Sequence, residues 1–315
     1  MMKQYYLGID LGGTRIKMGI VSDGRVIARR IVPARSAHGL AAALPQLEEE
    51  MNGLMATLPE GSKILAGVGL AFPGLVNTNS KKILSTNAKY DDAPSLDLEQ
   101  WVTDKWSVPF AIDNDARMAT VGEWKYGAGT DTNDLVVMTI GTGVGTSAVM
   151  EGKLLRGKHF QAGCLGGHFS IQVNGRPCSC GNEGCVEAHG STWSLAEITR
   201  EHPLFPQSVL STADTIDFSV LFKAAAGKDA LALEIVKYSM DVWSAGIVNL
   251  IHAYDPEVIV IGGGVLHSAD VIMPYIREKV KKHAWTPWGT VDIRPTQLAE
   301  DAGILGVVHT LQYSI

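Results

Sequence analysis

The sequence predicts an α/β protein built from two related lobes. Segments with strand-like and helix-like patterns alternate along the chain, which is typical of α/β architecture. A length of 315 residues exceeds what one compact core usually holds, so we expect two lobes. The strand-turn-strand pattern of residues 7–27 returns in residues 136–155, which indicates two copies of one unit. Pattern alone leaves open the alternative of two unrelated glycine-rich hairpins.

Strands and helices alternate in the first part of the chain. Short apolar or alternating runs predict strands at residues 6–10, 16–21, 26–32, 64–71 and 109–112. Asp23-Gly24 is a hairpin signal between the second and third strands. Phe72-Pro73-Gly74 ends the fourth strand, because proline and glycine force the chain out of a sheet. Helical spacing predicts helices at residues 40–58, at 98–106 and from about 113–115 onward.

The later part of the chain is more helical. Apolar runs predict strands at residues 136–140, 147–150 and 258–261. Residues 195–226 suggest short helices with a proline-containing loop. Longer helical patterns cover residues 231–254, 269–283 and 301–311. Asp301 suits a helix N-terminus, because the helix dipole favours negative charge there.

The composition is that of an ordinary folded protein. Hydrophobic residues make up 46% and charged residues 19%, which excludes a disordered chain, a collagen-like repeat or a coiled coil. The net charge of −6 argues against broad binding to nucleic acid or anionic membrane. We find no signal-peptide pattern and no apolar run near the roughly 20 residues of a membrane span. We therefore expect a soluble, cytoplasmic protein.

Three glycine-rich turns each follow an apolar strand, where α/β sheets place their ligands. They are Gly12-Gly13-Thr14, Gly141-Thr142-Gly143 and Gly262-Gly263-Gly264. Glycine lets backbone N–H groups approach phosphate oxygens, although each turn alone could be an ordinary tight turn. Together they favour a nucleotide ligand. The spacing matches neither a P-loop nor a dinucleotide fingerprint.

Polar side chains stand at the ends of two predicted strands. Asp10 could hold Mg²⁺ beside phosphates, or could cap the first turn. Lys17 could neutralise phosphate charge, or could be an ordinary exposed lysine. In Asp113-Asn114-Asp115, adjacent amide and carboxylate groups could bind sugar hydroxyls and accept a proton during phosphoryl transfer. Asp and Asn are also common N-caps, so one of the three residues is expected to cap the following helix.

The most specific local signal is the spacing of one histidine and three cysteines. His168, Cys178, Cys180 and Cys185 match a closed Cys3His site, which is structural zinc chemistry. Free buried cysteines are the alternative. Such a site would order a loop and would not activate water, because no ligand position is left open. Cys164 lies outside the spacing and is interpreted as a small apolar residue.

Taken together, these motifs resemble the ROK family of sugar kinases and repressors, within the actin-like ATPase and hexokinase class. The resemblance covers nearly the whole chain. It rests on Leu7–Thr14, Ile112–Ala116, Ile140–Gly145, Gly167–Glu187 and Ile261–Gly264. It implies an actin-like two-lobe fold with a cleft between its lobes. We expect one lobe to comprise residues 1–116 and 300–315, and the lobe with the zinc loop to comprise residues 117–299.

The resemblance also implies residue roles. It implies an ATP-dependent sugar kinase that uses Mg-ATP as phosphoryl donor and contains a structural Zn²⁺. The expected acceptor is O6 of a hexose or hexose derivative. Asp115 would be the general base. The sugar would contact Gly74, Asn114, Asp115, His168 and Glu187. Phosphates and nucleotide would bind Asp10, Lys17 and the three glycine turns. A homodimer is expected as well.

One position departs from the family pattern. The kinases usually carry a glutamate three residues before the zinc histidine, where this chain has Leu165. Losing a polar partner leaves a sugar hydroxyl unpaired, so we expect a sugar other than simple glucose, one that suits an apolar wall.

Three alternatives to a kinase differ in what they require of the sequence. A catalytically idle sugar-binding or sensing protein also fits the change at Leu165, and ATP turnover separates it from a kinase. A repressor would need a DNA-binding extension, which we do not expect here. A zinc hydrolase is disfavoured because the metal site looks coordinatively full.

Overall fold

The computed structural model describes residues 3–58, 64–86 and 89–313. These residues form two compact units. The first comprises Met1–Asn133, Glu151–Cys164 and Gln297–Ile315, and the second comprises Asp134–Met150 and Leu165–Thr296. Among the described helices, none is both long enough and apolar enough to cross a membrane.

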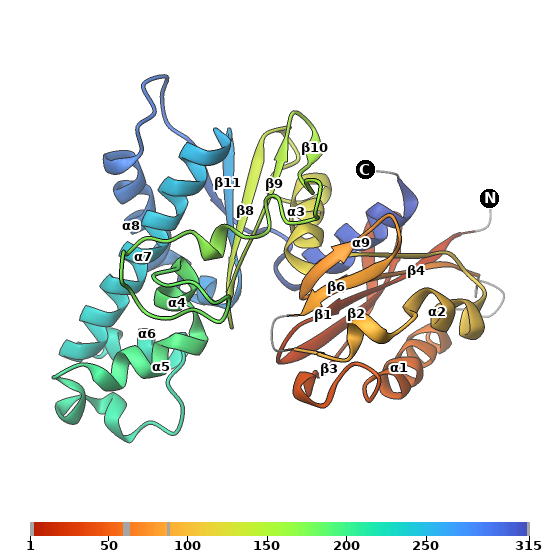
Figure 1. Cartoon of the computed structure of the whole chain (residues 1–315), viewed down its shortest axis with the longest axis horizontal. Helices are drawn as coiled ribbons and strands as arrows, with labels where there is room; N and C mark the ends of the chain where they lie inside the picture. Colours follow the sequence, from red (N-terminus) through yellow and green to blue (C-terminus); the bar gives the residue numbers. More distant parts are fainter. Residues whose placement is uncertain (1–2, 59–63, 87–88, 314–315) are drawn as a thin grey trace. The chain divides into compact units, whose positions relative to one another are not determined.

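The first unit is a five-stranded sheet covered by helices on both faces (Figure 1). Its strand order is β3-β2-β1-β4-β7. The strands are β1 (Tyr5–Leu11), β2 (Arg15–Ser22), β3 (Arg25–Pro33), β4 (Leu65–Phe72) and β7 (Phe110–Asn114). The first three pair antiparallel, whereas β4 pairs parallel with β1 and β7 parallel with β4. A separate hairpin joins β5 (Gly74–Asn77) and β6 (Lys82–Thr86).

The two faces of this sheet are packed differently. The helices are α1 (Leu44–Ala56), α2 (Leu98–Trp106), α3 (Asp115–Tyr126) and α9 (Ala302–Gln312). Leu7 and Ile9 of β1 share one apolar core with buried residues of α1 and α2. On the opposite face, a side chain at Gly8 would collide with Ile304, so glycine lets α9 approach the sheet closely. Asp10 lies on this second face, because side chains alternate along a strand.

The second unit repeats the arrangement of the first. Four strands of the second five-stranded sheet belong to this unit, in the order β9-β8-β11-β12, with β9 antiparallel to β8 and the others parallel. The strands are β8 (Leu135–Ile140), β9 (Val144–Met150), β11 (Val258–Gly262) and β12 (Asp292–Pro295). The two-residue strand β10 (Lys153–Leu154) follows β9. The order matches β2-β1-β4-β7, so the repeat predicted from sequence is confirmed.

The backbone of the two hairpin turns makes the same point. Asp23 and Gly24 have φ angles of 51° and 69°, and Glu151 and Gly152 have 51° and 68°. Both central residues are therefore left-handed in each turn, as a type I′ hairpin requires.

Helices make up most of the rest of the second unit. They are α4 (Val186–Gly190), α5 (Thr192–Glu201), α6 (Phe218–Ala226), α7 (Ala230–Tyr254) and α8 (Ala269–His283). The core of this unit centres on α7, where Trp243 is fully buried and donates its indole N–H to Gly190 O at 2.7 Å. The helices predicted at 98–106, 231–254, 269–283 and 301–311 are confirmed to within one residue at either end.

Some expectations differ from the structure in detail. The helix predicted at 40–58 begins at Leu44, where Pro45 suits the first turn. The hairpin β5-β6 and strand β12 were not predicted. The boundary expected at residue 116 falls at the start of α3, whereas all of α3 groups with the first unit. The reason is close helix packing: a side chain at Gly122 or Gly306 would collide with the backbone of the other helix, so α3 and α9 belong together.

Candidate functional site

Asp10 and Lys17 form a cross-strand pair in the first unit. They are register partners on β1 and β2, and Lys17 Nζ lies 3.4 Å from Asp10 Oδ2. Burial raises the pKa of Asp10, and the Lys17 charge opposes that shift. In the described part of the chain, Lys17 is the one side-chain partner of Asp10. Asp10 therefore does not cap the turn, and Lys17 is not an ordinary exposed lysine.

The first glycine turn is held through its carbonyl groups. Gly12 O accepts from Tyr90 Oη at 3.1 Å, and Gly13 O accepts from Ser36 Oγ at 2.9 Å. Thr14 O accepts from the Ala34 amide at 2.9 Å. The amides of Gly13 and Thr14 have no acceptor among the described residues, so they remain available to an anion. Sequence patterns gave no signal for the roles of Tyr90 and Ser36.

The segment Asp113-Asn114-Asp115 joins β7 to α3, and its residues have distinct environments. Asn114 is the N-cap, because its Oδ1 accepts from Arg117 N at 3.1 Å. Its Nδ2 donates to Gly74 O and to Asp115 Oδ1, both at 3.0 Å. Gly74 is required there, since a Cβ would collide with Ser85 O. The ambiguity over which residue caps the helix is thereby resolved.

Asp115 is a carboxylate poised near neutral pH. Burial and then the charge of Asp10 raise the pKa of Asp115 to about 6, against opposing effects from Lys89 and from a backbone hydrogen bond. That bond comes from the Ala116 amide, 2.8 Å from Asp115 Oδ1. A base works best when its pKa lies near the working pH, and Asp115 meets this condition.

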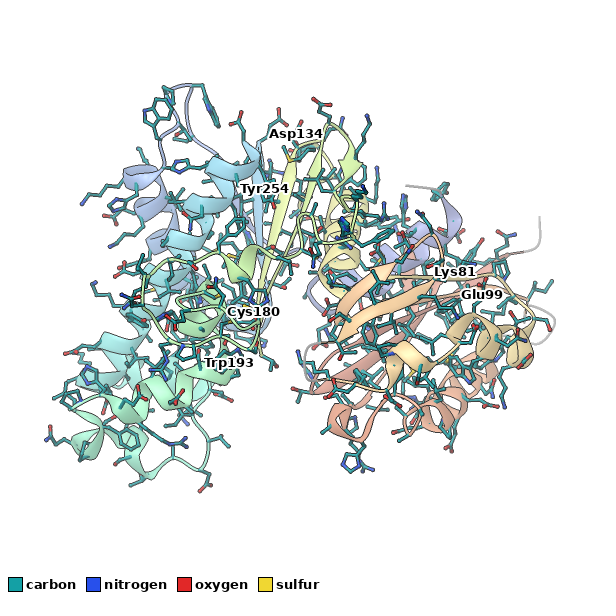
Figure 2. The ribbon with its side chains drawn as sticks, viewed as in Figure 1. Lys81, Glu99, Asp134, Cys180, Trp193 and Tyr254 are labelled. Atoms are coloured by element: carbon teal, nitrogen blue, oxygen red, sulfur yellow. The ribbon has the colours of Figure 1, made fainter. Side chains whose placement is uncertain are left out.

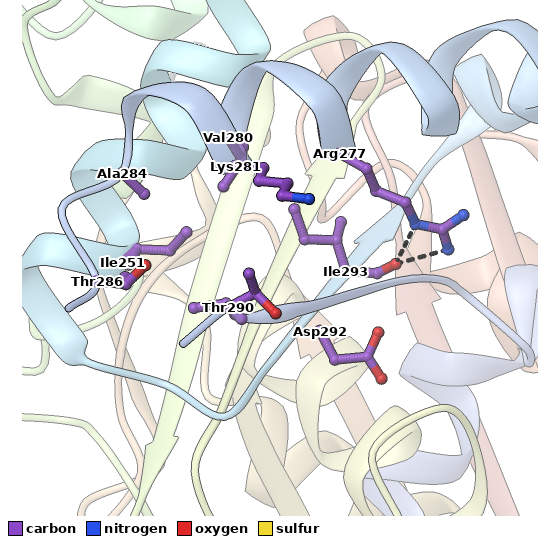
Figure 3. A pocket seen from close by; sticks show the side chains of 10 residues that line it. Ile251, Arg277, Val280, Lys281, Ala284, Thr286, Thr290, Asp292 and Ile293 are labelled. Atoms are coloured by element: carbon purple, nitrogen blue, oxygen red, sulfur yellow. Dashed lines mark hydrogen bonds between the residues drawn. The ribbon is translucent and has the colours of Figure 1, made fainter. Parts of the chain in front are cut away.

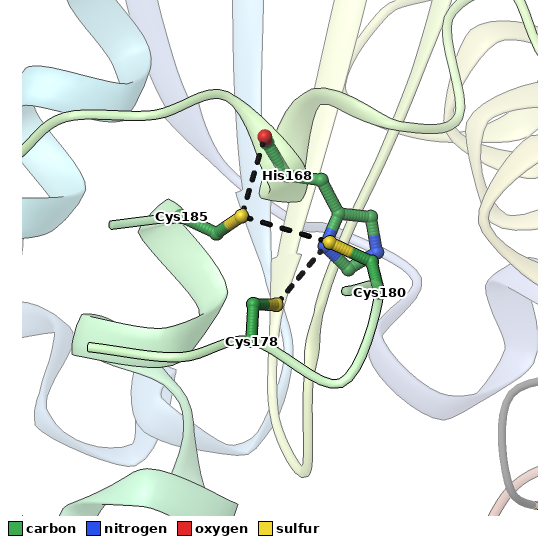
Figure 4. A group of neighbouring side chains, drawn as sticks. All are labelled: His168, Cys178, Cys180 and Cys185. Carbon is green, nitrogen blue, oxygen red and sulfur yellow. Dashed lines mark hydrogen bonds between the residues drawn. The ribbon is translucent and has the colours of Figure 1, made fainter. Parts of the chain in front are cut away.

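The predicted metal ligands converge in the second unit (Figure 4). One ligand atom from each of His168, Cys178, Cys180 and Cys185 lies within 4.8 Å of the others. Cys178 Sγ is 3.5 Å from His168 Nδ1, and Cys180 Sγ is 3.8 Å from Cys185 Sγ. A tetrahedral zinc site with Zn–S of about 2.3 Å and Zn–N of about 2.0 Å has S–S edges of about 3.8 Å and N–S edges of about 3.5 Å. The residues therefore fit zinc.

Cys164 does not belong to this cluster. It lies in the first unit, where its Sγ is 3.5 Å from Arg117 Nη2. The interpretation of Cys164 as a simple apolar residue was incomplete, because it contacts a buried cation.

Glu187 connects the zinc loop to the second glycine turn. It is buried on α4, and its Oε2 accepts from the Val144 amide at 2.8 Å. Its Oε1 lies 3.4 Å from both Ser179 Oγ and Trp193 Nε1. Trp193 and the zinc-loop residue Cys180 are both labelled in Figure 2. The sequence had suggested only a sugar contact for Glu187.

The second and third glycine turns lie together at one end of the second sheet. Gly141 O and Thr142 O accept from the first amides of α5, at 3.0 and 3.2 Å. The amides of Thr142 and Gly143 have no acceptor among the described residues. Gly263 has φ 96°, and a Cβ there would collide with Ile140 O, so the third turn packs against the end of β8. Such turns at adjacent strand ends suit a phosphate-bearing ligand.

Comparison with known proteins identifies the family. A family model described as the ROK family matches residues 6–312. The chain belongs to the ROK family. The glucokinase of Halalkalibacterium halodurans is 30% identical over 314 residues, which covers 97% of this chain and 94% of that protein. The xylose repressor of Bacillus spizizenii is 26% identical, which covers 96% of this chain and 76% of the repressor.

A solved structure extends the likeness to three dimensions. The crystal structure of a ROK family glucokinase from Streptomyces griseus, in complex with glucose and AMPPNP, matches with a TM-score of 0.81 and 25% identity. The match covers 98% of this chain and 99% of that one. The predicted actin-like α/β fold of this ROK protein is therefore confirmed.

A separate cavity of about 360 Å³ lies in the second unit of this ROK protein (Figure 3). It is lined by the end of α8, by Ile251 of α7 and by the segment 286–293. Asp292 in its wall pairs with Val258 at the start of β11, whereas the third glycine turn follows the end of β11. None of the predicted site residues lines this cavity.

Proposed function

We propose that this protein is an ATP-dependent sugar kinase that transfers the γ-phosphate to O6 of a hexose or hexose derivative. Asp115 carries the proposal, because its pKa of about 6 lets it accept the hydroxyl proton as the oxygen attacks phosphorus. The products are the sugar phosphate and ADP, and the proton passes to Asp115. Relatives named glucokinase support this reaction type.

The phosphates of ATP are proposed to bind the glycine turns. The free amides of Gly13, Thr14, Thr142 and Gly143 offer donors to phosphate oxygens. Asp10 would hold the Mg²⁺ that offsets phosphate charge, and Lys17 would add a positive charge beside it. The glucokinase structure with AMPPNP supports the nucleotide assignment.

The sugar is proposed to contact Asn114, Asp115, His168 and Glu187, with Gly74 in the wall. His168 and Glu187 flank the cysteines of the zinc loop in sequence, so a zinc ion held by His168, Cys178, Cys180 and Cys185 would fix both side chains. The role of zinc is therefore structural, and removing it should weaken sugar binding without removing a catalytic group.

Leu165 is proposed to select the sugar. Its side chain is 37% exposed, and it precedes two glycines that have no room for a Cβ. A Cβ at Gly166 would press on Leu250 and Thr146, and one at Gly167 would collide with Val144 O. The backbone here packs directly on β9, so Leu165 is held in one place. An apolar side chain at this position favours a deoxy or substituted sugar over glucose.

The runner-up is a sugar-binding protein without kinase activity, in line with the repressors among the relatives. One experiment separates the two. ADP release from Mg-ATP is measured with zinc-replete protein across aldohexoses, ketohexoses, N-acetylhexosamines and glycosides. We expect release with at least one sugar, lost in Asp115→Asn and kept in Asp104→Asn, an exposed control. Calorimetric sugar binding without any ADP release would establish a sugar-binding protein without kinase activity.

The oligomeric state is a separate proposal. Light scattering of the same preparation tests the expected homodimer.

A further inference from the structure

A fully buried arginine lies two residues after Asp115. The side chains of Arg117 and Asp113 are both completely inaccessible, and Arg117 Nη1 lies 3.3 Å from Asp113 Oδ1. Arg156 approaches the other carboxylate oxygen of Asp113, with Nη2 and Nε each 3.0 Å from Oδ2. Buried charges are retained in proteins when they are paired and hydrogen-bonded, as these are.

The guanidinium of Arg117 also binds the backbone of a distant segment. We call residues 155–164 the strap. Arg117 Nε donates to Leu155 O at 3.1 Å, and Nη2 donates to Phe160 O at 2.8 Å and to Ala162 O at 3.1 Å. Three carbonyl groups of the strap therefore converge on one guanidinium, whose five donors suit such a fork.

The strap takes an unusual backbone path to reach Arg117. Phe160 has φ 58°, a left-handed conformation that is unfavourable for a residue with a large side chain, and Gly157 and Gly163 also have positive φ. Such a path persists only when other contacts hold it, and the hydrogen bonds to Arg117 are contacts of that kind. Arg156 adds a second link, because it belongs to the strap and binds Asp113.

The strap leads directly into the sugar-selecting residues. It ends at Cys164, and Leu165 and the glycines before His168 follow without a break. The anchored end of the strap therefore restrains the residue that directly precedes the Leu165–His168 segment. Arg117 belongs to the first turn of α3, which starts with Asp115. Its side chain therefore links α3 to the strap.

We propose that Arg117 is a positioning residue for sugar binding, which holds the strap against α3 and thereby restrains the chain immediately before Leu165. The proposal rests on the sugar-kinase function above. Among the described residues, the Arg117 side chain hydrogen-bonds to Asp113 and to the strap, and to none of the proposed sugar- or nucleotide-binding residues, so the proposal has it act through the strap. Its loss therefore changes the KM for sugar more than kcat or the KM for ATP.

The test compares Arg117→Lys, which keeps the charge but loses the forked geometry, with two controls. Arg277→Lys removes an arginine that binds a backbone carbonyl elsewhere, Ile293 O, through Nε and Nη2. Leu54→Ala destabilises the core of the first unit without touching the strap. All proteins are assayed well below their melting temperatures, with zinc content measured to show that the metal loop is intact.

We expect Arg117→Lys to raise the KM for sugar about 10- to 100-fold, with kcat and the KM for ATP within about threefold. Trypsin should also cut Arg117→Lys after Lys158, an exposed lysine in the strap, faster than it cuts wild type or Arg277→Lys at the same bond. An unchanged sugar KM overturns the proposal, whatever the cleavage rate. A rise of the same size in Leu54→Ala also overturns it, because general destabilisation would then be the cause.

A second measurement decides the question if Arg117→Lys does not fold. The Ala162 amide donates to Arg156 O at 3.1 Å within the strap, so its hydrogen exchange in wild type reports strap order. We expect slow exchange with and without sugar, whereas slow exchange only with sugar would show that Arg117 does not order the strap. If wild type turns over no sugar, the kinase proposal fails, and calorimetric affinities of the same variants for sugar still test the role of Arg117.

Discussion

Replacing Asp115 with asparagine should make the protein more stable and inactive at the same time. The folded protein raises the pKa of Asp115 from 3.8 to about 6. A carboxyl group with a raised pKa favours folding while it is protonated, below pH 3.8, and loses that advantage as the pH rises to about 6. At pH 7 the charged carboxylate therefore destabilises the fold.

The magnitude follows from the shift. About two pKa units correspond to about 3 kcal/mol, an upper value because the side chain is not completely buried. Asparagine keeps an acceptor for the Ala116 amide, which lies 2.8 Å from Asp115 Oδ1. We therefore expect Asp115→Asn to gain about 1–3 kcal/mol in unfolding free energy at pH 7. Sugar phosphorylation should fall by about 10²- to 10⁴-fold, the usual contribution of a general base.

The assay is urea unfolding of wild type and Asp115→Asn at pH 7 and at pH 4, with Asp104→Asn as an exposed control that changes little. The gain in unfolding free energy of Asp115→Asn over wild type should be present at pH 7 and nearly absent at pH 4, where the Asp115 carboxyl of the folded wild type is largely protonated. Equal gains at both pH values would refute the electrostatic reasoning. A loss of stability at pH 7 would show that the charged form of Asp115 is favoured by contacts that outweigh its burial.

Three further predictions test other parts of the molecule. Cys178→Ser should lose the bound zinc, measured per chain by atomic emission, whereas Cys164→Ser should keep it; equal zinc in both variants would contradict the assigned ligand set. Leu165→Glu should raise kcat/KM for glucose relative to the preferred sugar, and an unchanged ranking across the sugar panel would remove Leu165 from the selecting role. Gly263→Ala should cost about 1–3 kcal/mol and raise the KM for ATP, because φ is 96° and the new Cβ meets Ile140 O. Gly53→Ala, which meets nothing within 4 Å, is the control and should be neutral or stabilising.

The sequence predicts those features that depend on neighbours along the chain. Asp23-Gly24 and Glu151-Gly152 identify two turns of one type, because glycine at the second position permits the positive φ that both turns adopt. The four candidate metal ligands were found by spacing, since a loop that wraps an ion must return its ligands at short intervals. The order of strands around the repeat then follows from the fold class.

Features that depend on tertiary contacts could not be predicted in this way. Strand β12 contains only four residues, Asp292–Pro295, and only Ile293 among them is buried, so it lacks an apolar pattern. The sequence shows Glu187 as one acidic residue beside a cysteine, but its hydrogen bond to the Val144 amide depends on how α4 packs against β9. From the sequence, Arg117 is an ordinary charged residue on a helix, whereas in the structure its side chain is completely buried.

Asp113, Asn114 and Asp115 show how the structure separates three adjacent polar residues whose environments the sequence alone leaves open. The pattern allows a cap, a sugar contact or a base at each position. Asn114 is the cap, and Asp113 is neutralised by Arg117 and Arg156. Among the described residues Asp115 has no ion-pair partner; the charge of Lys89 lowers its pKa, but the larger charge effect comes from Asp10, which has the same sign as Asp115. Burying two carboxylates two residues apart is feasible because one of them is fully paired, which leaves the other as the group whose proton affinity the site can use.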